Sequence, residues 1–231
     1  MKKIIIIFLV LFIIAFLIRD KIDFNQENLI TAEVVKNHDF GSIEVYFCQV
    51  DDCEGMIVSR INQSKKVDCA FFDLNLDYLE KILLEKQYRL IMDDRNADKT
   101  ELASMKDNRS ALMHNKFCIY DNNLISTGSF NPTFNDANKN DNNLIFIESK
   151  TLAQNYEDEF NEMWSGVFGN GEKVKNPKIE FNGFIIENYF CPEDSCEEQT
   201  ISILKNAQNS IYFMTFSFTS DNIGEEIIRN F

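Results

Sequence analysis

Residues 112–131, LMHNKFCIYDNNLISTGSFN, are the most informative stretch of the sequence. Residues 114–120 alternate in polarity like a half-buried strand, 121–123 are Asp-Asn-Asn turn residues, and 124–127 form a second apolar run. The pattern predicts a β-hairpin.

One face of this hairpin gathers four chemically useful side chains. His114 and Lys116 are two residues apart, so both leave the same face of the first strand. Ser129 and Asn131 follow the returning strand and are expected to approach that face from its end. An imidazole can attack phosphorus or transfer a proton, while an ammonium and neutral donors stabilise the phosphoryl oxygens. The His-Lys pair alone is more simply an ordinary strand face, but the Gly-Ser-x-Asn run favours a catalytic site.

The pattern H-x-K-x4-D followed by G-S-x-N resembles the signature of the phospholipase D superfamily, which includes phospholipases D, cardiolipin synthases, phosphodiester nucleases and tyrosyl-DNA phosphodiesterases. The resemblance covers residues 43–168 and, as the start of a second module, 186–231. It implies an α/β fold in which helices flank a mixed β-sheet. It also implies a phosphodiesterase that needs no metal ion or other cofactor.

The resemblance assigns a role to each motif residue. His114 would be the nucleophile that forms a phosphohistidine, or its general-acid counterpart. Lys116, Ser129 and Asn131 would bind the phosphate. Asp121 completes the catalytic motif in a structural role, holding the turn.

One position departs from the family pattern. The family commonly has a carboxylate after G-S-x-N that orients the catalytic histidine, but the aligned residue here is Asn142, with Asp141 beside it. Both are candidates for orienting His114. An asparagine stabilises an imidazolium less than a carboxylate does.

The sequence also contains an internal repeat. Residues 43–54, IEVYFCQVDDCE, match residues 186–197, IENYFCPEDSCE, at eight of twelve positions, and residues 67–74 align with 211–218 after one insertion. Each copy predicts a strand, a Cys-bounded turn, a helix, an apolar strand and a second helix. The predicted strands are 44–48 and 67–72 in the first copy, and 187–191 and 211–218 in the second.

This repeat predicts two modules, of which the second is incomplete. The expected divisions are a signal anchor at 1–21, a linker at 22–40, a module with one motif at 41–168, a linker at 169–185 and a partial module at 186–231. A family member uses two motifs, so three interpretations stay open. The chain is a fragment of a longer enzyme, its site is completed by a homodimer or a separate C-terminal module, or it is an inactive remnant.

Residues 4–18 form an unbroken apolar run, preceded by two lysines and followed by Arg-Asp-Lys without a small-residue cleavage site. The run predicts a single membrane-spanning signal anchor with the globular part outside the cytoplasm, although a buried core helix is the alternative.

Six cysteines bear on this location. Cys48/Cys53 and Cys191/Cys196 are close pairs that form disulfides in an oxidising compartment, or stay thiols or zinc ligands in a reducing one. Cys69 and Cys118 lie in apolar runs and are expected to be free, buried side chains.

The net charge, 23 − 37 = −14, excludes a globally attractive field for nucleic acid or anionic lipid. A membrane-anchored phosphodiesterase acting on phospholipid or nucleic acid is the leading interpretation. A cardiolipin synthase-like transferase and a non-catalytic membrane-tethered module are the alternatives.

Overall fold

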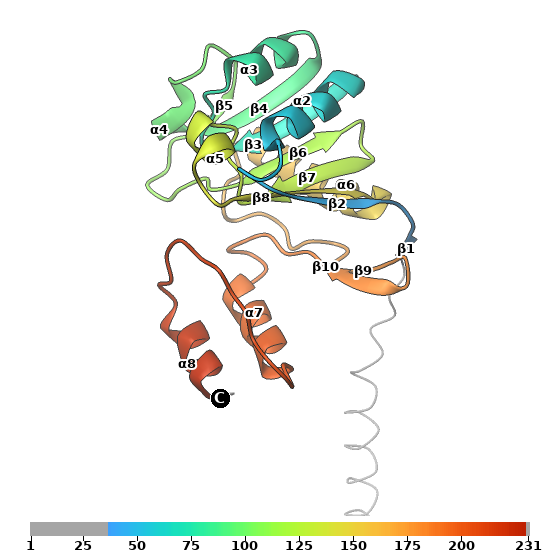
Figure 1. The fold of residues 1–231 in the computed structure, drawn as a ribbon, viewed down its shortest axis with the longest axis vertical. Helices are drawn as coiled ribbons and strands as arrows, with labels where there is room; N and C mark the ends of the chain where they lie inside the picture. Colours follow the sequence, from blue (N-terminus) through green and yellow to red (C-terminus); the bar gives the residue numbers. More distant parts are fainter. Residues whose placement is uncertain (1–36, 230–231) are drawn as a thin grey trace, which may run out of the picture. The chain divides into compact units, whose positions relative to one another are not determined.

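The computed structural model describes residues 37–229 (Figure 1). The predicted signal anchor, with its apolar run at 4–18, and most of the predicted first linker lie outside these residues. Within 37–229, no helix has the length and apolar character that crossing a bilayer requires.

The core of the protein is a seven-stranded mixed sheet in the order β2-β8-β7-β6-β3-β4-β5. Strands β3, β4 and β5 are parallel to one another, and the remaining neighbours are antiparallel. The strands are β2 (Ile43–Phe47), β3 (Lys66–Phe71), β4 (Gln87–Asp93), β5 (Met105–Asp107), β6 (Lys116–Tyr120), β7 (Leu124–Gly128) and β8 (Asn143–Glu148). The expected mixed α/β fold and the 114–127 hairpin are therefore confirmed.

Helices cover both faces of this sheet (Figure 1). Alternate residues of β6 face opposite layers: Cys118 and Tyr120 pack with α2 (Cys53–Gln63) and α3 (Asp77–Leu84), whereas Phe117 and Ile119 pack with α6 (Lys150–Trp164). This arrangement explains why the central strands are apolar on both faces. The short helices α4 (Asp94–Ala97) and α5 (Phe134–Asn138) follow β4 and β7.

A separate three-stranded sheet contains β1 (His38–Asp39), β9 (Lys178–Phe181) and β10 (Phe184–Glu187). The two regions predicted as linkers, 22–40 and 169–185, therefore contain paired strands, while the division into modules stays a prediction. Asp39 also accepts hydrogen bonds from the Ser149 hydroxyl and from the Thr151 N–H and hydroxyl at the start of α6. These contacts join the first described residues to the core.

All six cysteines are paired. The close pairs Cys48–Cys53 and Cys191–Cys196 are disulfides, the first of the two alternatives. The expectation of free thiols at Cys69 and Cys118 is wrong, because they form a third disulfide. Both are buried as expected, but β3 and β6 pair with Cys69 directly opposite Cys118, and this register brings the sulfur atoms together.

The second copy of the repeat follows the first only in part. Helices α7 (Cys196–Lys205) and α8 (Asp221–Arg229) form, but residues 211–218 are not a strand, and β10 ends at Glu187 instead of covering 187–191. No strand among residues 37–229 pairs with 211–218, so its backbone lacks the ladder that defines a strand. The side chains of Tyr212, Met214 and Phe216 are consequently exposed.

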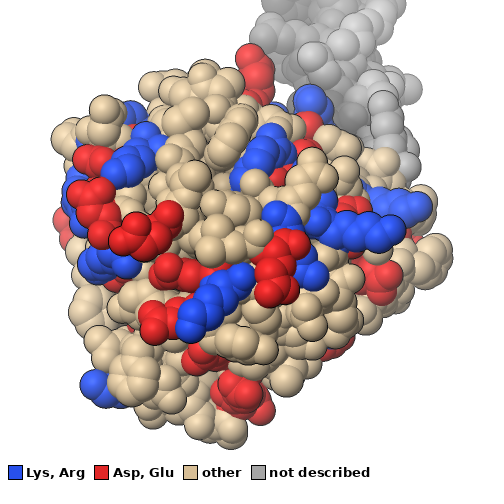
Figure 2. Space-filling view, turned by 90° about the horizontal axis from the view of Figure 1, so that it is seen from above, with Lys and Arg blue, Asp and Glu red and all other residues tan. Residues whose placement is uncertain are grey.

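Charged side chains of both signs share the surface. On the face shown in Figure 2, Lys and Arg lie among Asp and Glu, and no continuous basic band crosses it.

Replacing both Cys69 and Cys118 by alanine is expected to destabilise the domain by about 2–5 kcal/mol, since the bond constrains 49 residues of separation in the unfolded chain. Urea unfolding of the wild type and the double variant measures this difference. A matched C48A/C53A variant removes a bond that spans a separation of only five residues, so it should lose less stability. Equal losses in the two variants would contradict the prediction.

Candidate active site

Most of the motif residues lie at one edge of the large sheet, whereas Asp121 lies at the other. Phe71, the last residue of β3, pairs with Lys116, the first residue of β6. β6 and β7 are antiparallel with Cys118 opposite Ser126, so continuing this register places Lys116 opposite Gly128. The start of β6 and the ends of β3 and β7 therefore converge, as the hairpin pattern predicted.

The Phe72 ring packs against both His114 and Lys116. The His114 ring packs edge-on against the Phe72 ring with 4.7 Å between centroids, and Lys116 Nζ lies 5.3 Å from the same ring centroid. Lys116 Nζ also donates a 3.0 Å hydrogen bond to the backbone carbonyl of His114. The structure thus brings His114 and Lys116 together on one side of the sheet edge.

The surroundings lower the pKa of both His114 and Lys116. Partial burial lowers the pKa of His114, the Lys116 ammonium lowers it further, and the Asp93 carboxylate acts in the opposite direction. Burial lowers the pKa of Lys116 to about 8, although the Asp136 carboxylate opposes the change. At neutral pH the imidazole is therefore mostly neutral and able to act as a nucleophile, while the lysine is mostly charged.

Gly128 allows the chain to turn tightly into the run that contains Ser129 and Asn131. Its φ is +142°, and a Cβ atom there would lie 2.4 Å from the backbone oxygen of Asn143. Only glycine accommodates that approach. Ser129 follows directly, and its Oγ accepts a 3.0 Å hydrogen bond from the Asn143 N–H, which fixes the side chain at the end of β7.

Asn131 is held by a carboxylate that the motif pattern did not reveal. Its backbone N–H and its side-chain Nδ2 each donate a 2.8 Å hydrogen bond to Asp136 Oδ2. Asn131 Oδ1 is buried and accepts no hydrogen bond from the described part of the chain. Asp136 stands five residues after Asn131 in a polar run, so only its position after the motif could have drawn attention to it.

Asp121 lies at the opposite end of β6 from Lys116. Its carboxylate accepts hydrogen bonds of 3.0 and 2.9 Å from the backbone N–H groups of Lys65 and Lys66, and its own φ is +48°. These contacts tie the turn of the hairpin to the start of β3. They fit the structural role that the resemblance implies, and a distance of about five residues of strand separates Asp121 from the reacting groups.

The structure does not connect the two residues predicted to orient His114 with its ring. Asp141 is exposed and accepts a 3.1 Å hydrogen bond from Gln49 Nε2, and Asn142 uses its backbone carbonyl to bind the Cys48 N–H. Their predicted role stays a prediction. Asp93 is the carboxylate that acts on His114: it is buried at the end of β4, and its Oδ2 accepts a 3.0 Å bond from the N–H of Met113.

His114 lines a cavity of about 550 Å³. Apolar side chains from different parts of the chain line it, with Arg109 and Glu159 as charged groups. The apolar members include Leu112, Met113, Met163, Phe168 and Phe190. Such a mixed lining suits a ligand that carries an apolar portion beside a polar centre.

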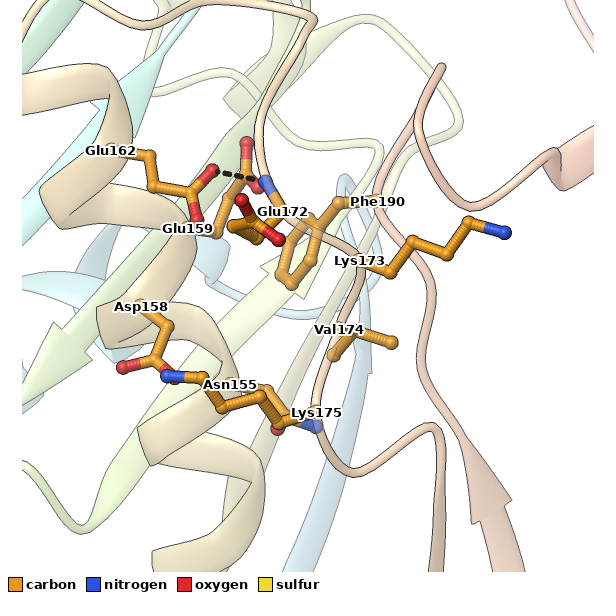
Figure 3. A pocket seen from close by; sticks show the side chains of 9 residues that line it. All are labelled: Asn155, Asp158, Glu159, Glu162, Glu172, Lys173, Val174, Lys175 and Phe190. Carbon is orange, nitrogen blue, oxygen red and sulfur yellow. Dashed lines mark hydrogen bonds and ion pairs between the residues drawn. The ribbon is translucent and has the colours of Figure 1, made fainter.

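Glu159 connects this cavity to a group of carboxylates. The oxygens of Glu159, Glu162 and Glu193 lie within 4.8 Å of one another, and Figure 3 shows Glu159 and Glu162 on the same helix, with Glu162 bonded to the N–H of Glu172. Burial, together with the neighbouring Glu193, Glu162 and Asp194 carboxylates, raises the pKa of Glu159 to about 7. Glu159 is therefore partly protonated at neutral pH.

Residues 57–164 match the protein family described as "Cardiolipin synthase, PLD-like domain". This part of the chain belongs to the phospholipase D superfamily. This match spans the sequence from α2 to the end of α6 and includes the whole motif, which confirms the resemblance seen in the sequence.

Phospholipase D relatives with curated names cover part of the chain. A mitochondrial cardiolipin hydrolase of Chlamydomonas reinhardtii is 27% identical over 116 residues, 44% of this chain and 52% of that protein. Its counterpart in Xenopus tropicalis is 30% identical over 63 residues, 27% of this chain and 30% of that protein. The chain thus spans about half or less of these relatives. The solved structure of the phospholipase D family member Nuc from Salmonella typhimurium superposes with a TM-score of 0.49 at 20% identity, over 54% of this chain and 94% of Nuc.

Replacing Glu159 by glutamine is expected to stabilise the protein at pH 8 by on the order of 1–3 kcal/mol. The raised pKa means that the protonated carboxyl stabilises the fold below pH 4.5, and this contribution is lost as the pH rises through about 7. At pH 4.5 the variant and the wild type should unfold alike. Denaturant unfolding at both pH values, with the exposed Glu198→Gln as control, checks this; an unchanged stability at pH 8 would refute it.

Proposed function

We propose that this chain carries one catalytic half-site of a phospholipase D-type phosphodiesterase. The observation that supports the proposal is the placement of His114 and Lys116 against the Phe72 ring, with His114 lining the cavity. Ser129 and Asn131 follow the end of the neighbouring strand β7. A neutral imidazole beside a charged ammonium is the combination that attack on a phosphodiester anion requires.

In the proposed reaction, a ring nitrogen of His114 attacks phosphorus. The P–N bond of a phosphohistidine forms as the P–O bond to the leaving alcohol breaks, and a proton donor on the opposite side protonates that alkoxide. Water then attacks phosphorus and gives a proton to that same donor, now a base, while the P–N bond breaks. This releases the neutral His114 imidazole, the reprotonated donor and the phosphomonoester product. Lys116 offsets the charge on the non-bridging oxygens throughout, while Ser129 and Asn131 hold them. An acceptor alcohol in place of water would give transfer, as in a synthase.

The opposite proton donor belongs, in this proposal, to a second motif. A second copy of the chain or a separate C-terminal module would supply that histidine, because one hairpin presents one imidazole to the cavity.

Phospholipid is the substrate class that the site favours, with nucleic acid as the alternative. The apolar side chains in the cavity would contact the apolar part of a lipid. The description of the matched family also names an enzyme that makes a lipid, cardiolipin synthase. A net charge of −14 and the interspersed charges of Figure 2 provide no long-range attraction for a polyanion.

The proposed location is a membrane surface outside the cytoplasm, with residues 4–18 as the anchor. Three disulfides among six cysteines support an oxidising compartment, since such bonds are rare where glutathione keeps thiols reduced.

Replacing His114 by alanine is expected to reduce hydrolysis of a bis-aryl phosphodiester by about a thousandfold or more, because the nucleophile is removed. The assay uses the full chain in detergent with EDTA, and phospholipid vesicles and single-stranded DNA are compared next. His38→Ala is the matched control: His38 is exposed and paired with Glu180 away from the site, so activity should stay at the wild-type level.

Equal turnover by the wild type and His114→Ala would contradict the proposed nucleophile. No turnover in any preparation, with or without an added C-terminal module, would instead support a non-catalytic membrane-tethered role.

The proposed site also predicts a pH profile. The value of kcat/KM should fall above about pH 8, because Lys116 loses its charge there. Lys116→Arg should lower the rate by about tenfold or more through altered geometry, yet remove this alkaline decline, because a guanidinium stays charged. If kcat/KM of Lys116→Arg still fell above about pH 8, a group other than Lys116 would control this fall.

A further inference from the structure

The His114 side chain has few contacts for a group that would have to meet phosphorus in one orientation. The residue is exposed and lines the cavity. Within residues 37–229, the one ring that packs against its imidazole is that of Phe72, with 4.7 Å between the ring centroids and an angle of 69° between the ring planes. An exposed side chain without such a contact changes rotamer within nanoseconds or less.

The backbone on both sides of His114 is fixed by hydrogen bonds. The N–H of Met113 donates to Asp93 Oδ2 at 3.0 Å, and the carbonyl of Asn115 accepts from the N–H of Phe72 at 3.0 Å. The freedom that remains to His114 is therefore rotation of its side chain. The Phe72 ring is the group that lies where it can limit this rotation.

Phe72 is itself fixed just beyond the end of β3. Its N–H is bonded to Asn115, and its carbonyl accepts a 2.8 Å hydrogen bond from Asn96 Nδ2. Asn96 belongs to α4 and is buried. Because both backbone polar groups of Phe72 are bonded, the direction in which its side chain leaves the chain is set.

A phenyl ring can support the motif without competing for its polar groups. The imidazole of His114 meets the ring in the edge-to-face arrangement that aromatic pairs favour, and Lys116 Nζ lies 5.3 Å from the ring centroid, within the range of a cation–π interaction. Phe72 has no polar side-chain atom, so it binds neither imidazole nitrogen. Both nitrogens of His114 stay available to a ligand.

The internal repeat keeps an aromatic residue at this position. In the alignment of residues 67–74 with 211–218, Phe72 corresponds to Phe216, whereas the buried Phe71 corresponds to Thr215. The repeat has therefore retained the aromatic side chain at the position that faces the motif and lost it at the neighbouring core position.

We propose that Phe72 is a positioning residue of the active site, whose ring holds the His114 imidazole in one orientation beside the Lys116 ammonium. Its effect on catalysis rests on the proposed phosphodiesterase function, whereas its effect on the His114 ring does not. Orientation matters for the reaction, because a small misplacement of a reacting group costs a large factor in rate.

The test measures the order of the His114 ring without requiring turnover. His38 and His114 are the two histidines of the chain, so ¹³C-labelled histidine gives two sets of ring signals, which His114→Ala assigns. In the full chain in detergent, ¹³C relaxation should give the His114 ring an order parameter near 0.85 in the wild type and below about 0.6 in Phe72→Leu, because an exposed ring without its support is flexible.

Two further variants separate the ring from other effects. Phe72→Tyr keeps the ring and should keep His114 ordered. Phe184→Leu removes an exposed ring from β10, in the separate three-stranded sheet, and should leave the His114 signals unchanged. A His114 ring as ordered in Phe72→Leu as in the wild type would overturn the proposal, as would equal losses of order in Phe72→Leu and Phe72→Tyr.

One measurement on the wild type alone guards against a variant that does not fold. Nuclear Overhauser effects between the ring protons of Phe72 and those of His114 are expected, since the two rings are in contact. Their absence would overturn the proposal whatever the variants do.

Diester hydrolysis by the same preparations tests the catalytic part. With an active wild type, Phe72→Leu should lose about tenfold or more, mainly in kcat, because the nucleophile is misplaced while the groups that bind the substrate remain. Phe72→Tyr should keep most of the activity, and full activity in Phe72→Leu would refute the catalytic part. A wild type without turnover would refute the proposed function, but the relaxation data would still decide whether Phe72 orders His114.

Discussion

The antiparallel register of β6 against β3 and β7 is the constraint on which the site depends. It places Cys69 opposite Cys118 in the sheet centre and Lys116 opposite Phe71 at the edge. Because Phe72 and Ser129 continue the two neighbouring strands beyond that edge, they reach the level of His114. A slip of one residue would turn His114 and Lys116 to the other face and separate them from Phe72. The covalent link between the two strands fixes this register two residues from Lys116.

Under the proposed function, the site also has to keep a charge on Lys116 where protein has displaced solvent. Burial alone favours a neutral lysine, and a neutral lysine would offer little to a phosphate. A carboxylate at hydrogen-bonding distance from the ammonium would favour its charge, but it would also occupy the position of an incoming phosphate. Asp136 bonds to Asn131 instead, and its carboxylate opposes the lowering of the Lys116 pKa by burial.

Local sequence was enough to predict the hairpin and the shared face of His114 and Lys116, because both rest on periodicity or spacing within about twenty residues. The mixed α/β fold was implied by the resemblance of the motif to a known family. The Cys69–Cys118 bond and the contacts of Asp39 with α6 join residues far apart in sequence, and no local pattern reveals which strands are neighbours. Asp136 escaped attention for a different reason: a single aspartate in a run of asparagines reads as a solvated turn until its burial is known.

The two copies of the repeat show how far such non-local pairing decides structure. Residues 67–71 and 211–215 occupy matching places in the two copies and are both rich in apolar side chains, yet the first lies within β3 and the second has no regular structure. In the large sheet, β3 is bonded to β4 on one side and β6 on the other, so its apolar side chains are covered on both faces. Nothing within residues 37–229 offers the second segment those neighbours. An apolar run indicates only that a segment can be buried as a strand. Whether the segment forms a strand depends on the strands that pair with it.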